Sequence, residues 1–220
     1  MRRASRAAFL FDVFFTASSV NSEPIMIHRL VQKASVVALG AALAAGAAFT
    51  ASFALNADAA PEAGKSTVSA VFKQMNVPVE GKFNHFSADV HFDPANAAAS
   101  SAKLDVEVAS FDLGSPDYNK EVAGDEWFDA GKFPHATFVS TQIKAGANGA
   151  YSVAGKLTIK GKTTDVVVPV QYHKDGANQV FDGALPIKRL AYNIGTGEWK
   201  DTSIVADDVQ IKFHIVAAAH

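Results

Sequence analysis

Hydrophobic and polar residues alternate one by one along most of the chain after about residue 65. The clearest example begins at residue 151, where Ser152, Lys156, Thr158 and Lys160 point one way and an apolar set points the other. That apolar set is Tyr151, Val153, Leu157 and Ile159. A period of two is typical of half-buried β-strands. Asn148-Gly149 and Gly161 bound this run, and both tolerate positive φ, so we expect tight turns between antiparallel strands.

Eight segments show this pattern, and together they predict an all-β protein. The expected strands are 67–77, 80–92, 103–111, 135–144, 150–160, 163–173, 178–190 and 206–216. Each has one polar face, whereas parallel strands are usually buried on both faces. One or two helical turns are expected within 119–131. Eight amphipathic strands can form a sandwich or a closed barrel, and closure removes exposed edges. We therefore predict an eight-stranded antiparallel β-barrel with a short helical or loop segment, whose interior can hold side chains or one small ligand.

Residues 1–59 differ from the rest of the chain and predict a signal peptide. Arg29 and Lys33 precede an Ala-rich apolar run at 34–55, and Ala57-Asp58-Ala59 fits an A-x-A cleavage pattern. The folded domain is then 60–220. The alternative is an uncleaved membrane anchor, since the run approaches the roughly 20 residues that a spanning helix needs. Met26 could be the true start of this signal, which leaves the folded domain unchanged.

Composition excludes several functional classes. The chain has no cysteine, so disulfides, thiolate metal sites and a cysteine nucleophile are ruled out. The net charge is −2 and no basic patch appears, so we expect no nucleic-acid partner.

Four segments of the sequence match motifs of a known protein family. They are PVEGKFNHFSADVHFDP (78–94), WFDAGKFPHATFVST (127–141), YSVAGKLTIKGKTTDVVVPV (151–170) and FDGALPIKRLAYNIGTGEW (181–199). On these motifs the chain resembles the YceI-like family of bacterial periplasmic proteins, over about residues 66–216. The first strand departs from the family pattern, because Lys65-Ser66 and Phe72-Lys73-Gln74 stand where many members carry histidines.

The resemblance implies a periplasmic, lipocalin-like barrel whose long hydrophobic cavity binds a polyisoprenoid, such as a polyprenyl phosphate or a quinone tail. Burial of such a chain is worth ~0.8 kcal/mol per CH₂, so affinity should come from the tail. The expected function is a non-catalytic carrier of an isoprenoid lipid or quinone. The alternative is an interaction or stress-response module that scavenges amphiphiles or partners a membrane b-type cytochrome. A homodimer is a further expectation, because members of this fold can pair.

Candidate ligand-binding residues come from the strand faces assigned to the interior. The aromatic candidates are Phe72, Phe86, Phe92, Phe138, Tyr151, Phe181 and Phe213. Each either lines a cavity or packs an ordinary core. Arg189 completes the set. Its planar fork suits a phosphate or quinone oxygen of a ligand, or it can pair with Asp201 or another acid to fix the corner before Tyr192, which is the role we favour. Trp127, Phe128 and Phe133 lie in an acidic loop, where we favour a packed barrel cap over a gate.

Chemistry other than binding has little support in the sequence. His85 and His91 are about 20 Å apart at strand rise, too far to share a metal. No G-x-S-x-G, HExxH or Gly-rich phosphate loop is present. We therefore expect no enzyme activity, no metal site and no cofactor beyond the bound lipid or quinone ligand.

Overall fold

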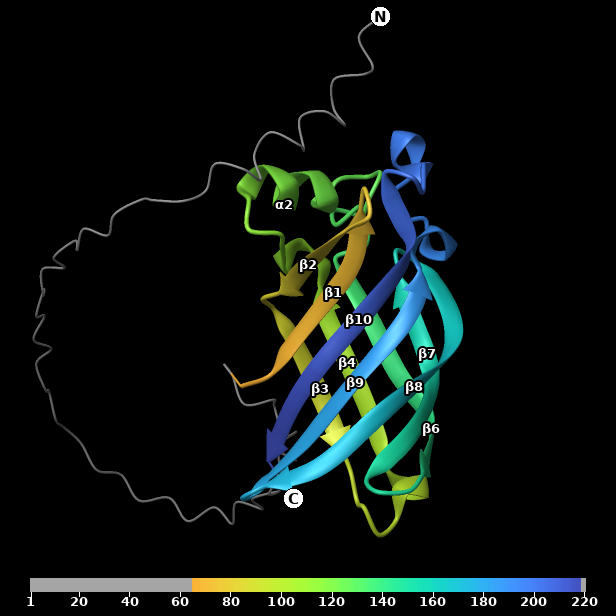
Figure 1. Cartoon of the computed structure of the whole chain (residues 1–220). Helices are drawn as coiled ribbons and strands as arrows, with labels where there is room; N and C mark the ends of the chain where they lie inside the picture. Colours follow the sequence, from red (N-terminus) through yellow and green to blue (C-terminus); the bar gives the residue numbers. More distant parts are fainter. Residues whose placement is uncertain (1–64, 219–220) are drawn as a thin grey trace, which may run out of the picture. The chain divides into compact units, whose positions relative to one another are not determined.

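The alternating segments form a single antiparallel sheet in the computed structural model, which describes residues 65–218 (Figure 1). The sheet has ten strand segments in the order β3-β4-β6-β7-β8-β9-β10-β1-β2-β5. Their bounds are β1 (Thr67–Gln74), β2 (Val77–Phe83), β3 (Phe86–His91), β4 (Ser101–Glu107), β5 (Phe111–Asp112), β6 (His135–Ala145), β7 (Ala150–Ile159), β8 (Lys162–Asp175), β9 (Asn178–Lys188) and β10 (Val205–Ala218). The all-β prediction is confirmed.

Two bent strands explain why ten segments appear where eight strands were predicted. The expected strand 80–92 breaks at Asn84-His85 into β2, which pairs with β1, and β3, which pairs with β4. The expected strand 103–111 breaks at a 3₁₀ turn, and its last two residues, β5, return to β2. Backbone bonds from Asn84 N to Ser110 O (3.2 Å) and from Glu107 N to His85 O (3.1 Å) hold the bends together. Because β2 and β3 are consecutive, the sheet curls round and its two ends meet through them.

Three hairpins are built on tight turns with positive φ. The turn between β7 and β8 has φ of 47° at Lys160 and 73° at Gly161, and Asn148-Gly149 has 55° and 74°. These are the two turns expected from the sequence, and positive φ matches the strand twist of such hairpins. Met75-Asn76 joins β1 to β2 with the same backbone signs, 48° and 64°. No glycine marks that third turn, so it is not evident from composition.

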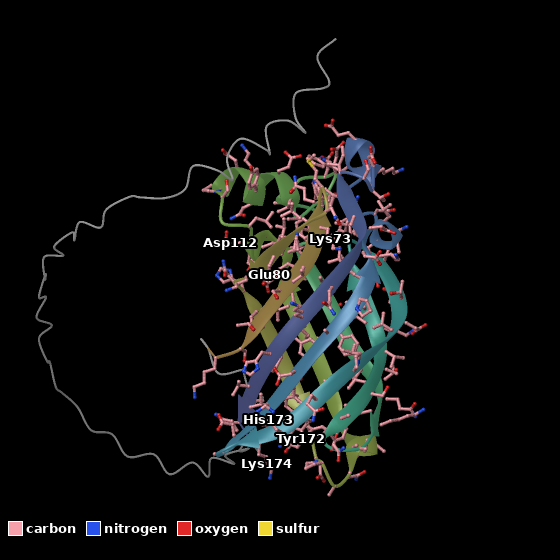
Figure 2. All side chains as sticks on the ribbon, in the orientation of Figure 1. Lys73, Glu80, Asp112, Tyr172, His173 and Lys174 are labelled. Atoms are coloured by element: carbon pink, nitrogen blue, oxygen red, sulfur yellow. The ribbon has the colours of Figure 1, made fainter. Side chains whose placement is uncertain are left out.

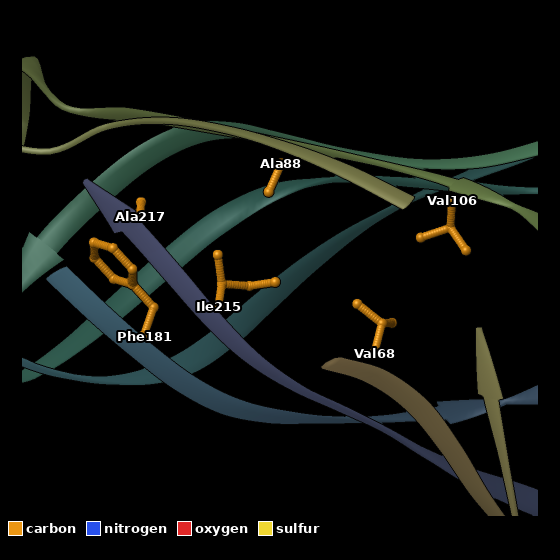
Figure 3. Packing of buried hydrophobic residues seen from close by; sticks show 6 residues of the cluster. All are labelled: Val68, Ala88, Val106, Phe181, Ile215 and Ala217. Carbon is orange, nitrogen blue, oxygen red and sulfur yellow. The ribbon is translucent and has the colours of Figure 1, made fainter. Parts of the chain in front are cut away.

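The core lies inside the curled sheet (Figure 3). It is formed by the buried cluster Val68, Ala88, Val106, Phe181, Ile215 and Ala217, contributed by β1, β3, β4, β9 and β10. Partly buried rings pack on this cluster, among them Phe83, Phe86 and Phe92. Full burial of each large aliphatic or aromatic side chain is worth ~1.5–3 kcal/mol. With no disulfide available, this apolar interior stabilises the fold.

The helix α2 (Pro116–Ala123) lies at one end of the barrel (Figure 1). It begins three residues before the expected helical segment, because Pro116 is at a first-turn position that has no need of an N–H donor. Tyr118 and Val122, four residues apart, are its buried face. Within residues 65–218, no helix combines the length and apolar character needed to cross a membrane. The predicted signal peptide at 1–59 lies outside the described residues.

The junction between β5 and α2 predicts a local acid sensitivity. The side chain of Asn119 donates to Asp112 Oδ1 (2.9 Å), and the backbone N–H of Gly114 donates to the same oxygen (2.8 Å). These bonds, that of Asn119 first, lower the pKa of Asp112 from its usual 3.8. A depressed carboxyl stabilises the fold above its unfolded pKa, and this contribution is lost as pH falls through the lower folded value. Figure 2 labels Asp112 beside α2.

We expect Asn119→Ala to raise the pKa of Asp112 and to weaken the loss of stability on acidification below pH 3.8. Carboxyl-carbon NMR titration of Asp112 measures the first effect, and urea unfolding across that pH range measures the second. An unchanged pKa of Asp112 in this variant would show that the hydrogen bond has no such role.

Candidate functional site

An apolar cavity of about 130 Å³ lies inside the barrel. Seven of the ten strand segments supply most of its wall, and its lining is almost wholly hydrocarbon. The aliphatic lining residues are Ala88, Val90, Ala102, Leu104, Ile143, Val153, Leu157, Val168, Val170, Leu185, Ile211 and Ile215. Lys103 is the one charged residue among those that line it. A site of this composition can bind hydrocarbon and offers a polar substrate almost nothing.

Side chains that point into the barrel alternate along the strands with those that point outward, and a bulge in β6 interrupts this order. The register between β6 and β7 shifts between Ser140 and Gln142, which marks a β-bulge. The extra residue reverses the parity, so Phe138 and Ile143 both line the cavity although simple alternation assigns them to opposite faces. Val139 is left on the outside and is 45% exposed.

Four aromatic rings close the end of the cavity away from α2. Phe92 contacts Tyr172, Tyr151 and Phe181 with ring centroids 4.8, 5.0 and 5.2 Å apart. The Phe92 carbonyl accepts a hydrogen bond from Nε2 of buried Gln179 (3.3 Å), which crosses from β9. Phe92 is the first residue after β3, in the connection that leads to β4. These rings therefore form a wall part of which is carried by a loop.

Tyr172 is one of two tyrosines at this aromatic end, the other being Tyr151, and Figure 2 shows Tyr172 far from Asp112 and α2. Its hydroxyl is buried and has no hydrogen-bond partner within residues 65–218. Burial raises the pKa of Tyr172 above its usual 10.0, and the neighbouring Tyr151 raises it further. The hydroxyl is therefore protonated at neutral pH, and this end of the cavity carries an uncharged donor.

The opposite end is a packed cap centred on Arg189. This residue is 2% exposed, and its guanidinium donates to five backbone carbonyls. The acceptors are Ala206 (3.0 Å), Ile194 (2.9 Å), Gly195 (3.0 Å), Trp199 (2.6 Å) and Val205 (2.7 Å). Its Cζ lies 5.8 Å from the ring centroid of Trp127, which packs on Trp199 at 5.4 Å. Burial lowers the pKa of Arg189, and Asp207 partly opposes that shift. The cap predicted for Trp127 and Phe128 is present, since Phe128 packs on Phe83 and Phe111.

The structure brings five of the eight predicted site residues to the cavity wall. These are Phe92, Phe138, Tyr151, Phe181 and Phe213. Phe86 packs on the core cluster, and Phe72 is half-buried on β1; neither is among the lining residues. Alternation identifies the inward face of a strand but not the height along the barrel axis, so it could not separate these two from the rest. Arg189 is at the capped end, where its forks are occupied by carbonyls and not by Asp201 or a ligand.

None of the aliphatic residues that line the cavity was among the eight predicted site residues. Residues such as Leu157, Val168 and Ile211 lie on inward faces that alternation already identifies, yet aliphatic side chains carry no signal that separates a cavity wall from a packed core. Only the height of each residue in the folded barrel makes that distinction.

Comparison with known proteins identifies the family. The YceI-like domain model matches residues 60–217, so the chain belongs to the YceI-like family. The chain is similar to BcnA of Burkholderia cenocepacia, with 62% sequence identity and a TM-score of 0.71, over 72% of this chain and 99% of that chain.

Two further proteins resemble the chain, one in part of its sequence and one in its fold. A UPF0312 protein of Vibrio cholerae is 35% identical over 94 residues, which cover 43% of this chain and 50% of that protein. The chain thus spans about half the length of the first curated relatives that it matches. A polyisoprenoid binding domain from Saccharophagus degradans shares the fold, with a TM-score of 0.60 and 17% identity over 74% of this chain and 99% of that chain.

Proposed function

We propose that this barrel binds the hydrocarbon chain of an isoprenoid lipid or quinone and acts as a non-catalytic carrier in the periplasm. The observation that carries the proposal is the apolar cavity inside the barrel. Membership of the YceI-like family and the shared fold with a polyisoprenoid binding domain support it. The cytochrome partner and the homodimer expected from the resemblance stay predictions.

The size of the cavity adds a requirement. At about 130 Å³ it is close to the ~150 Å³ engineered cavity that holds one benzene molecule. A long isoprenoid is much larger, so its binding requires wall side chains to move. The aromatic end is suited to this, because Phe92 is half-buried and belongs to a connection between strands. We therefore place the opening of the barrel at the Phe92 end and its fixed closure at the Arg189 cap.

Affinity for isoprenoid alcohols of increasing length, measured at low and high salt, tests the proposed function. Each additional buried CH₂ adds up to ~0.8 kcal/mol, less the cost of ordering the chain, so affinity should rise steeply with length. Salt should have little effect, because screening acts on charges and the lining is apolar. Affinity that ignores tail length and falls steeply with salt would show recognition of a charged head group and would contradict the proposal.

Phe92→Ala should accelerate release of a bound isoprenoid alcohol by about tenfold or more. Removal of the ring takes away the residue that joins Tyr151, Tyr172 and Phe181 across the end of the cavity. Stopped-flow exchange against excess unlabelled alcohol measures the rate. A tenfold faster release corresponds to a free-energy barrier to dissociation that is lower by about 1.4 kcal/mol. That is within the range of about 0.5–1.5 kcal/mol that one aromatic pair contributes.

The matched control is Phe128→Ala, which removes a half-buried ring from the capped end. It should lower stability without changing the release rate. Equal acceleration by the two variants would indicate general loosening of the barrel, and the opening would then not be at Phe92.

A further inference from the structure

Three phenylalanine rings in the barrel each cover a glycine of a neighbouring strand. A Cβ placed on Gly183 of β9 would lie 2.2 Å from Cζ of Phe213 on β10. The corresponding distance is 2.5 Å from Gly155 on β7 to Cζ of Phe138 on β6, and 2.3 Å from Gly81 on β2 to Cζ of Phe111 on β5. Each ring therefore occupies the volume that any other residue would fill with its side chain.

Backbone conformation does not explain these glycines. None of the three is among the residues with positive φ, so an L-residue could adopt the same backbone. Glycine inside a strand weakens it and commonly marks a close approach by another group. Here an aromatic ring is the nearest group at each glycine, and it can lie back against the sheet because no Cβ holds it off. A backbone carbonyl is also close at two of the three, since Val139 O would lie 2.6 Å from a Cβ on Gly155 and Pro169 O 2.9 Å from one on Gly183.

Two of the three rings border the cavity. Phe138 and Phe213 line it from β6 and β10, whereas Phe111 packs against Phe83 and Phe128 in the cap cluster. A methyl group on Gly183 would force the Phe213 ring to retreat by more than an ångström to reach ordinary contact at 3.4 Å. The neighbouring strands occupy the wall, so we expect the ring to move toward the cavity axis and to narrow the cavity.

We propose that Gly155 and Gly183 are specificity-determining residues, which keep the cavity wide enough for a methyl-branched chain. This inference rests on the proposed function. An isoprenoid carries a methyl branch on each repeating unit and is thicker than a straight alkyl chain of equal length. A narrowed cavity should therefore exclude the branched chain before the straight one.

Phytanol, the saturated alcohol with the carbon skeleton of four isoprene units, and n-hexadecanol provide the test, because both are saturated, share main-chain length and the hydroxyl group, and differ only in methyl branching. The protein is equilibrated with equal amounts of both, and native mass spectrometry measures the ratio of bound species. We expect Gly183→Ala to lower the ratio of branched to straight ligand by about tenfold, the discrimination that about one methylene gives in a hydrophobic pocket. Phe213→Leu added to Gly183→Ala should restore the ratio, since the smaller side chain frees the space.

Gly81→Ala is the matched control. The three atoms nearest to its new Cβ, at 2.3–2.9 Å, all belong to the Phe111 ring, which is a clash of the same kind but outside the cavity lining. It should leave the ratio unchanged. An equal shift in Gly81→Ala and Gly183→Ala would overturn the inference, because the effect would then come from general destabilisation.

Two further outcomes are decisive. Gly183→Ala that binds both alcohols with the wild-type ratio overturns the inference and leaves the proposed function standing; wild-type protein that binds neither overturns both. Pro169 O would lie 2.9 Å from the new Cβ, so the variant could fail to fold. Phe213→Leu alone then decides: the widened cavity should raise the ratio toward phytanol, and an unchanged ratio overturns the inference.

Discussion

Arg189→Ala should destabilise the barrel by at least about 3 kcal/mol, the largest effect expected of any single substitution in this chain. The guanidinium donates to five carbonyls from three parts of the cap, four of them in buried residues, and alanine would remove all five bonds. A typical domain is stable by only about 5–15 kcal/mol, so the variant should lose a large share of its stability. Urea unfolding followed by tryptophan fluorescence measures the change, since Trp127 and Trp199 both lie beside Arg189.

Two comparisons make this result specific. Arg189→Lys keeps the charge but lacks the planar fork, so it should recover only a small part of the lost stability. Lys188→Ala removes the adjacent exposed cation, which pairs with Asp208 at 2.6 Å, and should shift the unfolding midpoint far less. Near-wild-type stability of Arg189→Ala would mean that water replaces the guanidinium in the cap. Loss of ligand affinity in a stably folded Arg189 variant would return this residue to the ligand site.

Leu157→Trp should abolish most ligand binding while the barrel still folds. Leu157 is 7% exposed and lines the cavity from β7, so the larger indole has only the cavity into which to extend. Exclusion of even two CH₂ groups of ligand costs about 1.6 kcal/mol, which lowers affinity by more than tenfold. Titration with geranylgeraniol, beside an unfolding curve for each variant, separates binding from folding.

Ile159→Trp is the control for this substitution. Ile159 is two residues further along the same strand and equally buried, at 6% exposed, but it is not among the cavity-lining residues. Both variants overpack the interior and should lose about 1–3 kcal/mol of stability. Only Leu157→Trp should lose affinity. Full affinity in a folded Leu157→Trp would place the ligand outside this cavity.

Most strands could be predicted because the same alternation of apolar and polar residues recurs in each of them. Strands with one buried face need alternation. In β7 and β10 it predicted the observed bounds to within one or two residues, together with the inward face of most of each strand. The breaks at Asn84-His85 and at the 3₁₀ turn Val108–Ser110 were not predicted, although the apolar positions change parity at each of them, from Phe83 to Phe86 and from Val108 to Phe111. Each bend is held by backbone bonds between segments more than 20 residues apart, which no local pattern records.

The sequence indicated which faces point inward but not which inward residues border the cavity. Phe138 and Phe213, two of the candidate aromatics, lie in its wall, whereas its aliphatic lining was not among the candidates. The β-bulge in β6 changed the partners of Phe138, and the glycines that seat the two rings gave no sign of that role in the sequence. Arg189 shows the same limit: its five acceptors are main-chain carbonyls, and any residue type supplies one. The pattern of side chains shows which face of a strand points inward. The height of a residue along the barrel axis, and the carbonyls that accept its hydrogen bonds, are seen only in the folded structure.

The central claim is that the barrel carries an isoprenoid or quinone through its tail. Mass spectrometry of an organic extract, from protein purified without detergent out of its native periplasm, tests it most directly. We expect one isoprenoid or quinone in near-stoichiometric amount, depleted in a parallel preparation of Leu157→Trp. A ligand-free extract, together with refolded protein that takes up no polyprenyl probe, would contradict the account and would make the cavity part of an ordinary core.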